Sequence, residues 1–250
     1  VWLFRGGLAI ALLFEKQEDV VSDSIPQKFT SRVRDALERS PGARVFLLPI
    51  RAKLAISYLT PTMARMFKWL FMSRELDNFT YQLTVKGERY MAHSLALALG
   101  STPEVMQVYF DELKLDTELR RWIIDLSRNG ERRRTADPRA DFGRRIGWYA
   151  VVRHMRPHVV VETGVEKGLG AILLCAALKR NVDEGFPGRY YGTDIYRGAG
   201  YLLNNSPYKE FGKVLYGDSI QSLEALNEMI DVFINDSDHS HIYEFNEYRT

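Results

Sequence analysis

The sequence predicts an α/β protein whose carboxyl-terminal part is a Rossmann-like, doubly wound parallel sheet, preceded by a helical amino-terminal region. Three observations support this: a glycine-rich turn after an apolar run, three further short apolar runs, and an acidic residue at the end of each run. The segments between the runs are long enough for the crossovers that parallel strands require. The runs end at Glu162, Asp194, Asp218 and Asp236.

The first run, Val159-Val160-Val161, is followed by Glu162 and a turn that contains two glycines. A continuous β-branched run is typical of a strand buried on both faces. Gly164 and Gly168 let the backbone approach a ligand closely because neither has a Cβ. The apolar stretch 171–178 then predicts a helix that begins at this turn.

The glycine spacing indicates which cofactor to expect. A dinucleotide-binding turn reads G-x-G-x-x-G and places bare backbone under a pyrophosphate. Here Glu166 stands at the second glycine position. A carboxylate there disfavours a phosphate and tolerates a cation, so the turn favours S-adenosylmethionine, which carries a sulfonium.

The strand-end acids share one position in the predicted sheet. In a doubly wound sheet, the carboxyl ends of all four strands meet at one edge, where ligands bind. A single Asp at a strand end is most often a turn or a helix cap. Four such acids in phase favour a binding crevice.

These segments resemble the class I S-adenosylmethionine-dependent methyltransferases, and within them the small-molecule O-methyltransferases with an Asp-x-Asp-His segment after the fourth strand. The resemblance covers residues 143–250. It rests on Val160-Val161-Glu162-Thr163-Gly164, Gly192-Thr193-Asp194, Gly217-Asp218-Ser219 and Phe233-Ile234-Asn235-Asp236-Ser237-Asp238-His239-Ser240.

The resemblance implies cofactor roles for residues at the first three strand ends. Glu162 and Gly164 would form the first cofactor motif, with Glu162 near the methionine amino end. Gly168 of the same turn is a further candidate cofactor-binding residue. Asp194 would accept hydrogen bonds from the ribose hydroxyls. Asp218 and Ser219 would border the adenine. Two departures from the family pattern are Glu166-Lys167 in the turn and a polar loop, 181–188, which could extend over the pocket.

The fourth strand end carries the candidate catalytic and metal residues. The resemblance implies that Asp236 sits beside the departing methyl group. Asp236 and Asp238 could bind Mg²⁺, which prefers oxygen ligands and would hold a substrate hydroxyl. His239 could act as a general base, because imidazole titrates near neutral pH. Alternatively, Asp238 or Ser240 caps the next helix, and we expect His241 to be a surface residue.

Three other functions stay open at this point. A metal-dependent oxygenase could use Asp238, His239 and His241 as its ligands, although neighbouring side chains rarely converge on one ion. A nicotinamide-dependent oxidoreductase is disfavoured by Glu166. A non-catalytic module could keep the cofactor fold to bind a partner.

Composition excludes several classes. The chain has 250 residues, of which 46% are hydrophobic and 26% charged, as in ordinary globular domains. A net charge of +2 gives no argument for a nucleic-acid partner. The single cysteine, Cys175, rules out a disulfide framework within the chain and makes a cytoplasmic location the default. We therefore expect a small-molecule substrate and no integral membrane segment. Whether the protein forms a homo-oligomer is open.

Residues 1–142 predict a mainly helical region, and residues 143–250 the cofactor domain. Helical patterns cover 28–39, 87–99, 101–113 and 119–126, and the apolar run at 1–14 predicts a buried helix or strand. The stripe Met63, Met66, Phe67 and Leu70 could contact a membrane surface or pack on the main domain. The basic stretch 128–145 reads as a solvated linker, or else as a lid or a binding site for an acidic substrate.

The carboxyl end at Thr250 follows the helix expected after the fourth strand. A fold of this class has about three more strands, so we expect the sheet to be cut short with one edge left open.

Overall fold

The computed structural model describes residues 2–5, 8–11, 48–76, 79 and 82–250. The described chain separates into two compact units, one within residues 16–79 and the other comprising residues 80–250 with the amino-terminal strands. The helix predicted over 28–39 lies outside the described residues. Each unit is considered by itself.

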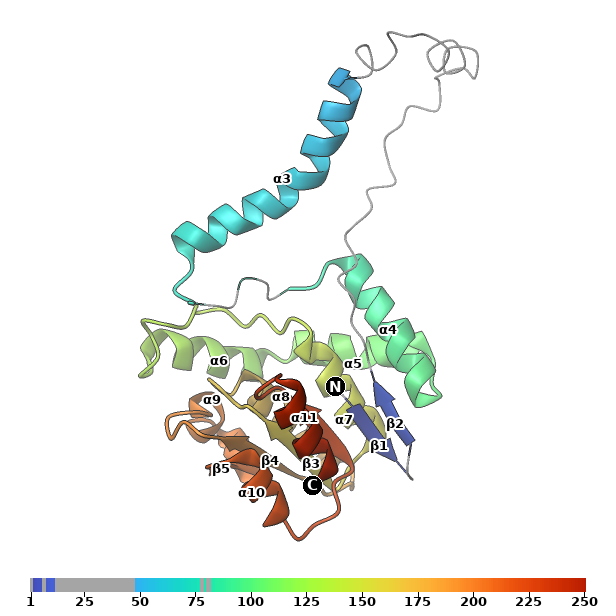
Figure 1. Ribbon diagram of the computed structural model, residues 1–250, viewed down its shortest axis with the longest axis vertical. Coiled ribbons are helices and arrows are strands. Elements are labelled where there is room, and N and C mark those ends of the chain that lie inside the picture. The colour runs from blue at the N-terminus through green and yellow to red at the C-terminus, as the bar shows by residue number, and fades with distance from the viewer. Residues whose placement is uncertain (1, 6–7, 12–47, 77–78, 80–81) are drawn as a thin grey trace. The chain divides into compact units, whose positions relative to one another are not determined.

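The larger unit is built on a six-stranded sheet in the order β2-β1-β6-β3-β4-β5 (Figure 1). Its parallel strands are β3 (Val159–Thr163), β4 (Arg189–Asp194), β5 (Gly212–Tyr216) and β6 (Val232–Asn235). β3 lies between β4 and β6, and β5 lies outside β4. The predicted fold class, a Rossmann-like α/β sheet, is therefore confirmed.

The amino-terminal segment supplies two further strands, β1 (Trp2–Arg5) and β2 (Leu8–Ala11). They form an antiparallel hairpin, and β1 pairs with β6 through Trp2↔Phe233 and Leu3↔Val232. The expectation of an open edge beside the fourth parallel strand is therefore wrong. The apolar run at the start of the chain donates part of the pairing that this edge needs.

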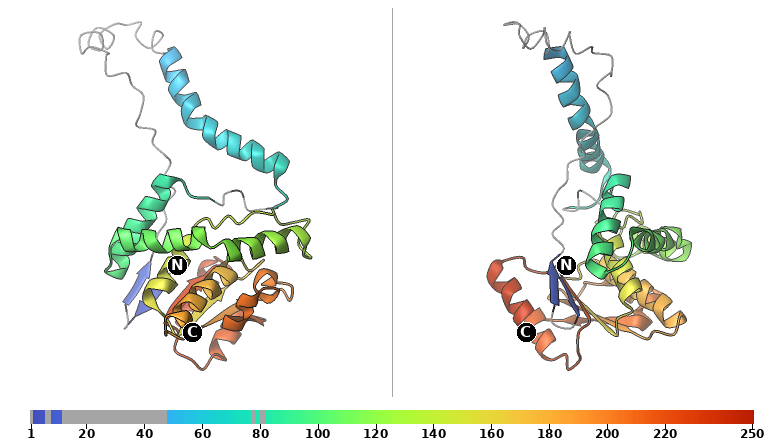
Figure 2. Two further views of the ribbon diagram at one scale, coloured as in Figure 1. Left: turned by 180° about the vertical axis from the view of Figure 1, so that it is seen from behind. Right: turned by 90° about the vertical axis from the view of Figure 1, so that its right-hand side faces the viewer.

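Helices cover the two faces of the sheet unequally (Figure 2). One face carries the larger hydrophobic cluster, and the other packs against α10 (Ser219–Glu224) and α11 (His241–Arg249). Helices whose residues enter the larger cluster are α4 (Val85–Leu99), α5 (Pro103–Leu115), α6 (Thr117–Asn129), α7 (Arg145–Met155), α8 (Leu169–Asp183) and the short α9 (Tyr201–Asn204), with the 3-10 helix η1 (Pro207–Phe211).

Alternation along the strands produces these two clusters, because neighbouring side chains point to opposite faces. Val160 and Tyr190 join the larger cluster with α7 and α8, whereas Val161 and Tyr191 join the smaller one. The register pairs Glu162 with Gly192 and with Ile234, so Glu162 belongs to the larger-cluster face.

A buried ion network joins three helices of that face. Arg153 of α7 is 4% exposed and donates to Glu112 of α5 at 2.7 Å and to Asn181 and Glu184 at the end of α8. Tyr149 donates to Glu112 at 2.6 Å. A buried guanidinium that is paired on several sides fixes the positions of α5, α7 and α8.

The segment after α6 differs from the expected solvated linker. Its chain turns irregularly from residue 130 to 144, yet Ala136, Ala140 and Phe142 are buried. Gln82 donates to Asp141 at 2.6 Å, and the Arg132 guanidinium lies 5.0 Å from the Tyr196 ring centroid. Its apolar side chains thus anchor the segment. The compact unit reaches back to residue 80, while the functional boundary at 142/143 stays a prediction.

The smaller unit contains α3 (Leu48–Met72), a 25-residue helix with Pro61 inside it. Two aromatic pairs lie within this unit: Phe67 stacks on Phe71, and Trp69 meets Phe79 edge to face. Among the described residues, no helix is both long enough and apolar enough to cross a membrane.

Candidate cofactor site at the carboxyl ends of the strands

The four predicted acids lie at the carboxyl ends of parallel, mutually paired strands. Glu162 is the last residue but one of β3, Asp194 ends β4, and Asp218 and Asp236 follow β5 and β6. The backbone joins these ends directly: the Gly164 N–H donates to Thr193 and the Asp236 N–H to Thr163, both at 2.9 Å. The predicted edge is therefore a real feature of the fold.

The glycines of the turn after β3 are required by the chain's own backbone. Gly164 has φ +82°, and a Cβ there would lie 2.2 Å from the Asp236 carbonyl oxygen. Gly168 has φ +88°, and its Cβ would lie 2.8 Å from the Cα of Gly200. Only glycine combines such angles with such close contacts. The sequence predicted a close approach to a ligand, and the structure shows a close approach of neighbouring loops.

Asp194 organises this turn. Its carboxylate accepts from the backbone N–H groups of Val165 at 3.1 Å, Glu166 at 2.9 Å and Tyr196 at 2.8 Å. Directly after it, Ile195 and Tyr196 are 81% and 57% exposed. The acid thus positions the loop, and exposed apolar surface lies next to it.

Asp218 and Ser219 start α10. Asp218 caps the helix by accepting from the Gln221 N–H at 3.0 Å, and it accepts from the Tyr243 hydroxyl at 2.9 Å. The Ser219 hydroxyl is buried and contacts Tyr243 at 2.8 Å and Glu247. Capping is thus an actual role of Asp218, whereas contact of these residues with an adenine stays a prediction.

Glu247 is a buried acid at this edge that the sequence analysis did not single out. Although 3% exposed, it accepts from Thr163, Ser219, Asn235 and Ser237. One carboxylate on α11 therefore ties together three strand or helix ends. Its spacing of four residues from Tyr243, which places both on one helix face, was the available signal.

Glu162 is buried beneath the edge. Its carboxyl accepts from the Tyr190 hydroxyl at 2.5 Å, and a Cβ on Gly170 would lie 2.2 Å from it. Burial raises the pKa of Glu162 to about 8, although the Tyr190 hydrogen bond and Arg145 oppose the shift. Contact of this acid with a ligand's amino group remains a prediction.

Asp236 faces two basic side chains. Its carboxylate lies 3.4 Å from an Arg145 nitrogen and 3.8 Å from the His239 ring. Burial raises the pKa of Asp236, while Arg145 and His239 lower it. Arg145, whose guanidinium also lies 5.2 Å from the Trp148 ring centroid, was not singled out from the sequence. Its place at the end of the basic stretch 128–145 was the available signal.

The proposed metal residues are less well arranged. Asp238 is exposed and accepts from the backbone N–H and the hydroxyl of Ser240, at 2.8 and 3.1 Å. His241 is exposed and stacks on Phe245. Within the part of the chain that the structure describes, no group of three or more His, Cys, Asp or Glu side chains could hold a metal ion. The oxygenase alternative therefore loses its ligand set of Asp238, His239 and His241.

The predicted loop over the pocket is at the wrong end of the sheet. Asn181 is still within α8, buried and bonded to the Val152 carbonyl at 2.9 Å. The remaining loop leads from α8 into the start of β4. A helix-to-strand connection lies at the amino-end edge of a parallel sheet, opposite the strand-end acids. Cys175, buried in the same helix, has its pKa raised by burial, as an inert thiol would.

A family model described as a methyltransferase domain matches residues 161–250. This match confirms the predicted resemblance to class I S-adenosylmethionine-dependent methyltransferases. The matched segment begins within β3 and contains all four strand-end acids.

Structural comparison found a chain titled "cmcI-N160 SAH", with 19% identity and a TM-score of 0.32. The alignment covers 40% of this chain and 49% of that chain, so about half of the neighbour's length is represented. The search of curated proteins found no match.

Proposed function

We propose that the protein transfers a methyl group from S-adenosylmethionine to an oxygen atom of a small molecule. The observation that carries this proposal is the set of strand-end acids around a glycine turn, within a segment that matches a methyltransferase domain. Carboxyl-end crevices are where open α/β sheets bind ligands.

The residues at this edge fit a cationic cofactor. Acidic groups gather there: burial is the main cause that raises the pKa of Glu162 and of Asp236, and Asp194 and Asp236 add to the shift at Glu162, as Glu166 does at Asp236. Such an edge attracts a sulfonium and an ammonium group more than a pyrophosphate. Glu166 also has φ +50°, a conformation that glycine adopts more readily, at the position where a dinucleotide turn has glycine.

The polar and apolar groups at this edge suit the rest of the cofactor. Each carboxylate oxygen can accept more than one hydrogen bond, so Asp194 can hold the loop amides and still accept from ribose hydroxyls. Exposed Ile195 and Tyr196 offer apolar surface for a purine. Asp218 and Ser219 would border the same ring from the next strand end.

S-adenosylmethionine, when bound, supplies an electrophilic methyl group. The chain's own part in the reaction is to orient the acceptor hydroxyl and take its proton. Asp236 is partly exposed at the edge, with its charge held by Arg145, and His239 lies beside it. We propose Asp236 and His239 as the residues that position the hydroxyl and accept its proton.

A magnesium ion fits this arrangement poorly. Asp238 is exposed and accepts from Ser240, and the cationic Arg145 lies beside Asp236. Within the residues that the structure describes, no third His, Cys, Asp or Glu joins a group that could hold a metal ion, so we derive no step through a metal.

Methyl transfer from radiolabelled S-adenosylmethionine to a panel of small hydroxyl compounds tests the proposal. We expect label on an acceptor oxygen, with or without a chelator present. Asp231→Asn is a suitable control, because Asp231 binds backbone amides before β3, at the opposite edge. Label found only on nitrogen or carbon acceptors would contradict methyl transfer to oxygen. Failure to bind S-adenosylmethionine would contradict the proposal that the protein is a methyltransferase.

A further inference from the structure

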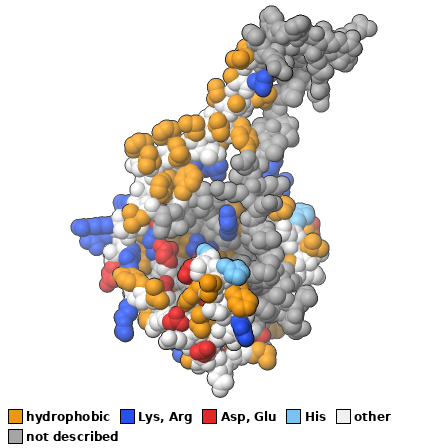
Figure 3. Space-filling model, in the orientation of Figure 1, with side chains coloured by type: hydrophobic (Ala, Val, Ile, Leu, Met, Phe, Trp, Pro, Cys, Tyr) orange, Lys and Arg blue, Asp and Glu red, His pale blue; other side chains and the backbone are white. Residues whose placement is uncertain are grey.

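Helix α3 exposes an unusual amount of apolar side chain. Leu48 is 63% exposed, Leu59 is 51% and Leu70 is 57%. Hydrophobic side chains follow the length of this helix in the space-filling view (Figure 3). Further large apolar side chains with exposed surface are Leu54, Ile56, Tyr58, Met63, Met66, Phe67, Phe71 and Met72. Isolated exposed apolar residues need no explanation, but a contiguous apolar surface indicates a binding face.

Seven apolar residues of α3 form one continuous stripe. Steps of three or four residues connect positions on the same side of a helix. All seven residues along one such path are apolar: Leu48, Ala52, Ala55, Leu59, Met63, Met66 and Leu70. At 3.6 residues per turn they fall within an arc of ~80°. We call these seven residues the α3 stripe.

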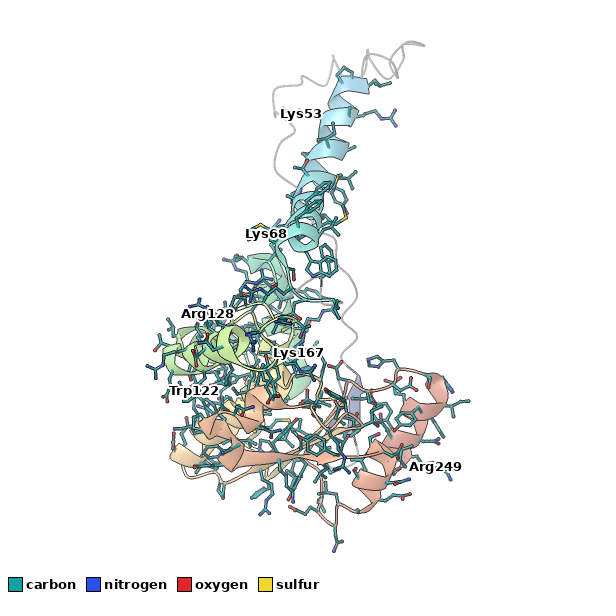
Figure 4. The ribbon with its side chains drawn as sticks, turned by 90° about the vertical axis from the view of Figure 1, so that its left-hand side faces the viewer. Lys53, Lys68, Trp122, Arg128, Lys167 and Arg249 are labelled. Atoms are coloured by element: carbon teal, nitrogen blue, oxygen red, sulfur yellow. The ribbon has the colours of Figure 1, made fainter. Side chains whose placement is uncertain are left out.

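The charges of α3 lie off this stripe and have one sign. Arg51, Lys53, Arg65 and Lys68 fall on the rest of the circumference, and no Asp or Glu occurs between residues 48 and 72. Figure 4 labels Lys53 and Lys68 on the helix. A helix with four cations and no acid complements an anionic surface, and its long basic side chains can reach headgroups while their stems stay apolar.

The same charges argue against a spanning helix. Arg65 and Lys68 interrupt the more apolar half, Pro61 interrupts the middle, and α3 fails the criteria for crossing a membrane. A basic helix with an apolar stripe and modest overall hydrophobicity lies in the plane of a bilayer interface. At about 1.5 Å per residue, α3 would cover ~37 Å of that surface.

We propose that α3 binds the surface of an anionic lipid bilayer, with the α3 stripe inserted among the acyl chains and the four cations at the headgroups. The inference is independent of the proposed chemistry. It assigns the protein a site of action at a membrane surface, where a weakly soluble acceptor would also gather.

Vesicle sedimentation of the whole protein tests this proposal. The probes are phosphatidylcholine vesicles with and without phosphatidylglycerol. We expect binding to the anionic vesicles only, and weakening by salt. Arg65→Gln combined with Lys68→Gln should weaken binding roughly thirtyfold. Each basic residue near an anionic surface raises the affinity for that surface by a similar factor, and the two factors multiply.

A matched pair of leucines tests the stripe itself. Leu59 lies on the stripe, and Leu54, which is 45% exposed, lies on the other side of the same helix. Leu59→Gln should weaken vesicle binding at least ~tenfold. Leu54→Gln should change it by less than ~twofold. Equal thermal melting of the two variants would show that folding is not the cause of the difference.

Three outcomes would overturn the proposal. They are no vesicle binding, equal binding to neutral vesicles, and equal effects of the two leucine variants. Light scattering after gel filtration covers the remaining alternative. An oligomer that Leu59→Gln dissociates, without any vesicle binding, would assign the α3 stripe to a second copy of the chain.

Discussion

At both ends of the parallel strands, an aspartate accepts hydrogen bonds from backbone N–H groups. At the amino-end edge, Asp231 accepts from the backbone N–H groups of His158 and Val159 at 2.7 and 3.0 Å. At the carboxyl-end edge, Asp194 likewise accepts backbone N–H groups. An aspartate bonded to loop amides therefore does not by itself indicate a ligand site.

What distinguishes the carboxyl-end edge is that acids with raised pKa values gather there. Burial is the main cause of the raised pKa of Glu162 and of Asp236; Asp194 and Asp236 add to the shift at Glu162, and Glu166 adds to that at Asp236. Burial of carboxyl groups lowers the stability of the fold, and perturbed carboxylates gathered at one edge indicate function. Substitutions at the two edges should therefore affect different quantities.

The largest effect should come from the glycine turn. Gly164→Val places a branched side chain at φ +82° and against the Asp236 carbonyl, so unfolding free energy should fall by more than ~3 kcal/mol. Gly185, near the amino-end edge, has φ +89° but open space around its Cβ position. Gly185→Val should cost only the backbone strain of about 1–2 kcal/mol. Urea unfolding measures both, and equal losses would show that the contact with Asp236 is unimportant.

Substitutions of Asp236 and Asp231 should have different effects on turnover. Asp236→Asn keeps the size of the side chain but removes the charge that Arg145 and His239 face. Turnover should fall at least ~100-fold, while affinity for S-adenosylmethionine changes little. Asp231→Asn should leave turnover nearly unchanged. Parallel losses of turnover and affinity in Asp236→Asn would make it a structural residue.

Alanine substitutions of Asp194 and Asp231 should have different effects on the affinity for S-adenosylmethionine. Both Ala variants lose hydrogen bonds to loop amides, so both should lose thermal stability. Only Asp194→Ala should also weaken S-adenosylmethionine binding, by at least ~tenfold, because hydrogen bonds to a charged group contribute roughly 1.5–3 kcal/mol each. An unchanged affinity in Asp194→Ala, measured by equilibrium dialysis, would remove this residue from the site.

A further prediction concerns the pH dependence of stability. Glu162 has a folded-state pKa of about 8, above the ordinary value of 4.5. Its folded form binds the proton more tightly, so its contribution to stability is complete below pH ~4.5 and is lost as pH rises towards ~8. Glu162→Gln cannot ionise, and its melting temperature should fall less between pH 5 and pH 8 than that of the wild type. Identical profiles would contradict the assigned burial effect.

The sequence predicted the parts of the fold that depend on local patterns. The four parallel strands follow from runs such as Val159-Val160-Val161, and the site edge from the acid that ends each run. Contacts over long distances could not be predicted. The pairing of residues 2–3 with β6 and the convergence of four side chains on Glu247 depend on tertiary placement. The prediction of a solvated linker rested on the many arginines of residues 128–145. It did not take into account the apolar Ala136, Ala140 and Phe142, which are buried.

Titration calorimetry with S-adenosylmethionine and with NAD⁺ tests the central claim most directly. The claim is that the acidic carboxyl-end edge binds a cationic cofactor in place of a pyrophosphate. It predicts saturable binding of S-adenosylmethionine at one site per chain and no measurable binding of NAD⁺. Binding of NAD⁺ with equal or higher affinity, or no binding of S-adenosylmethionine, would contradict it.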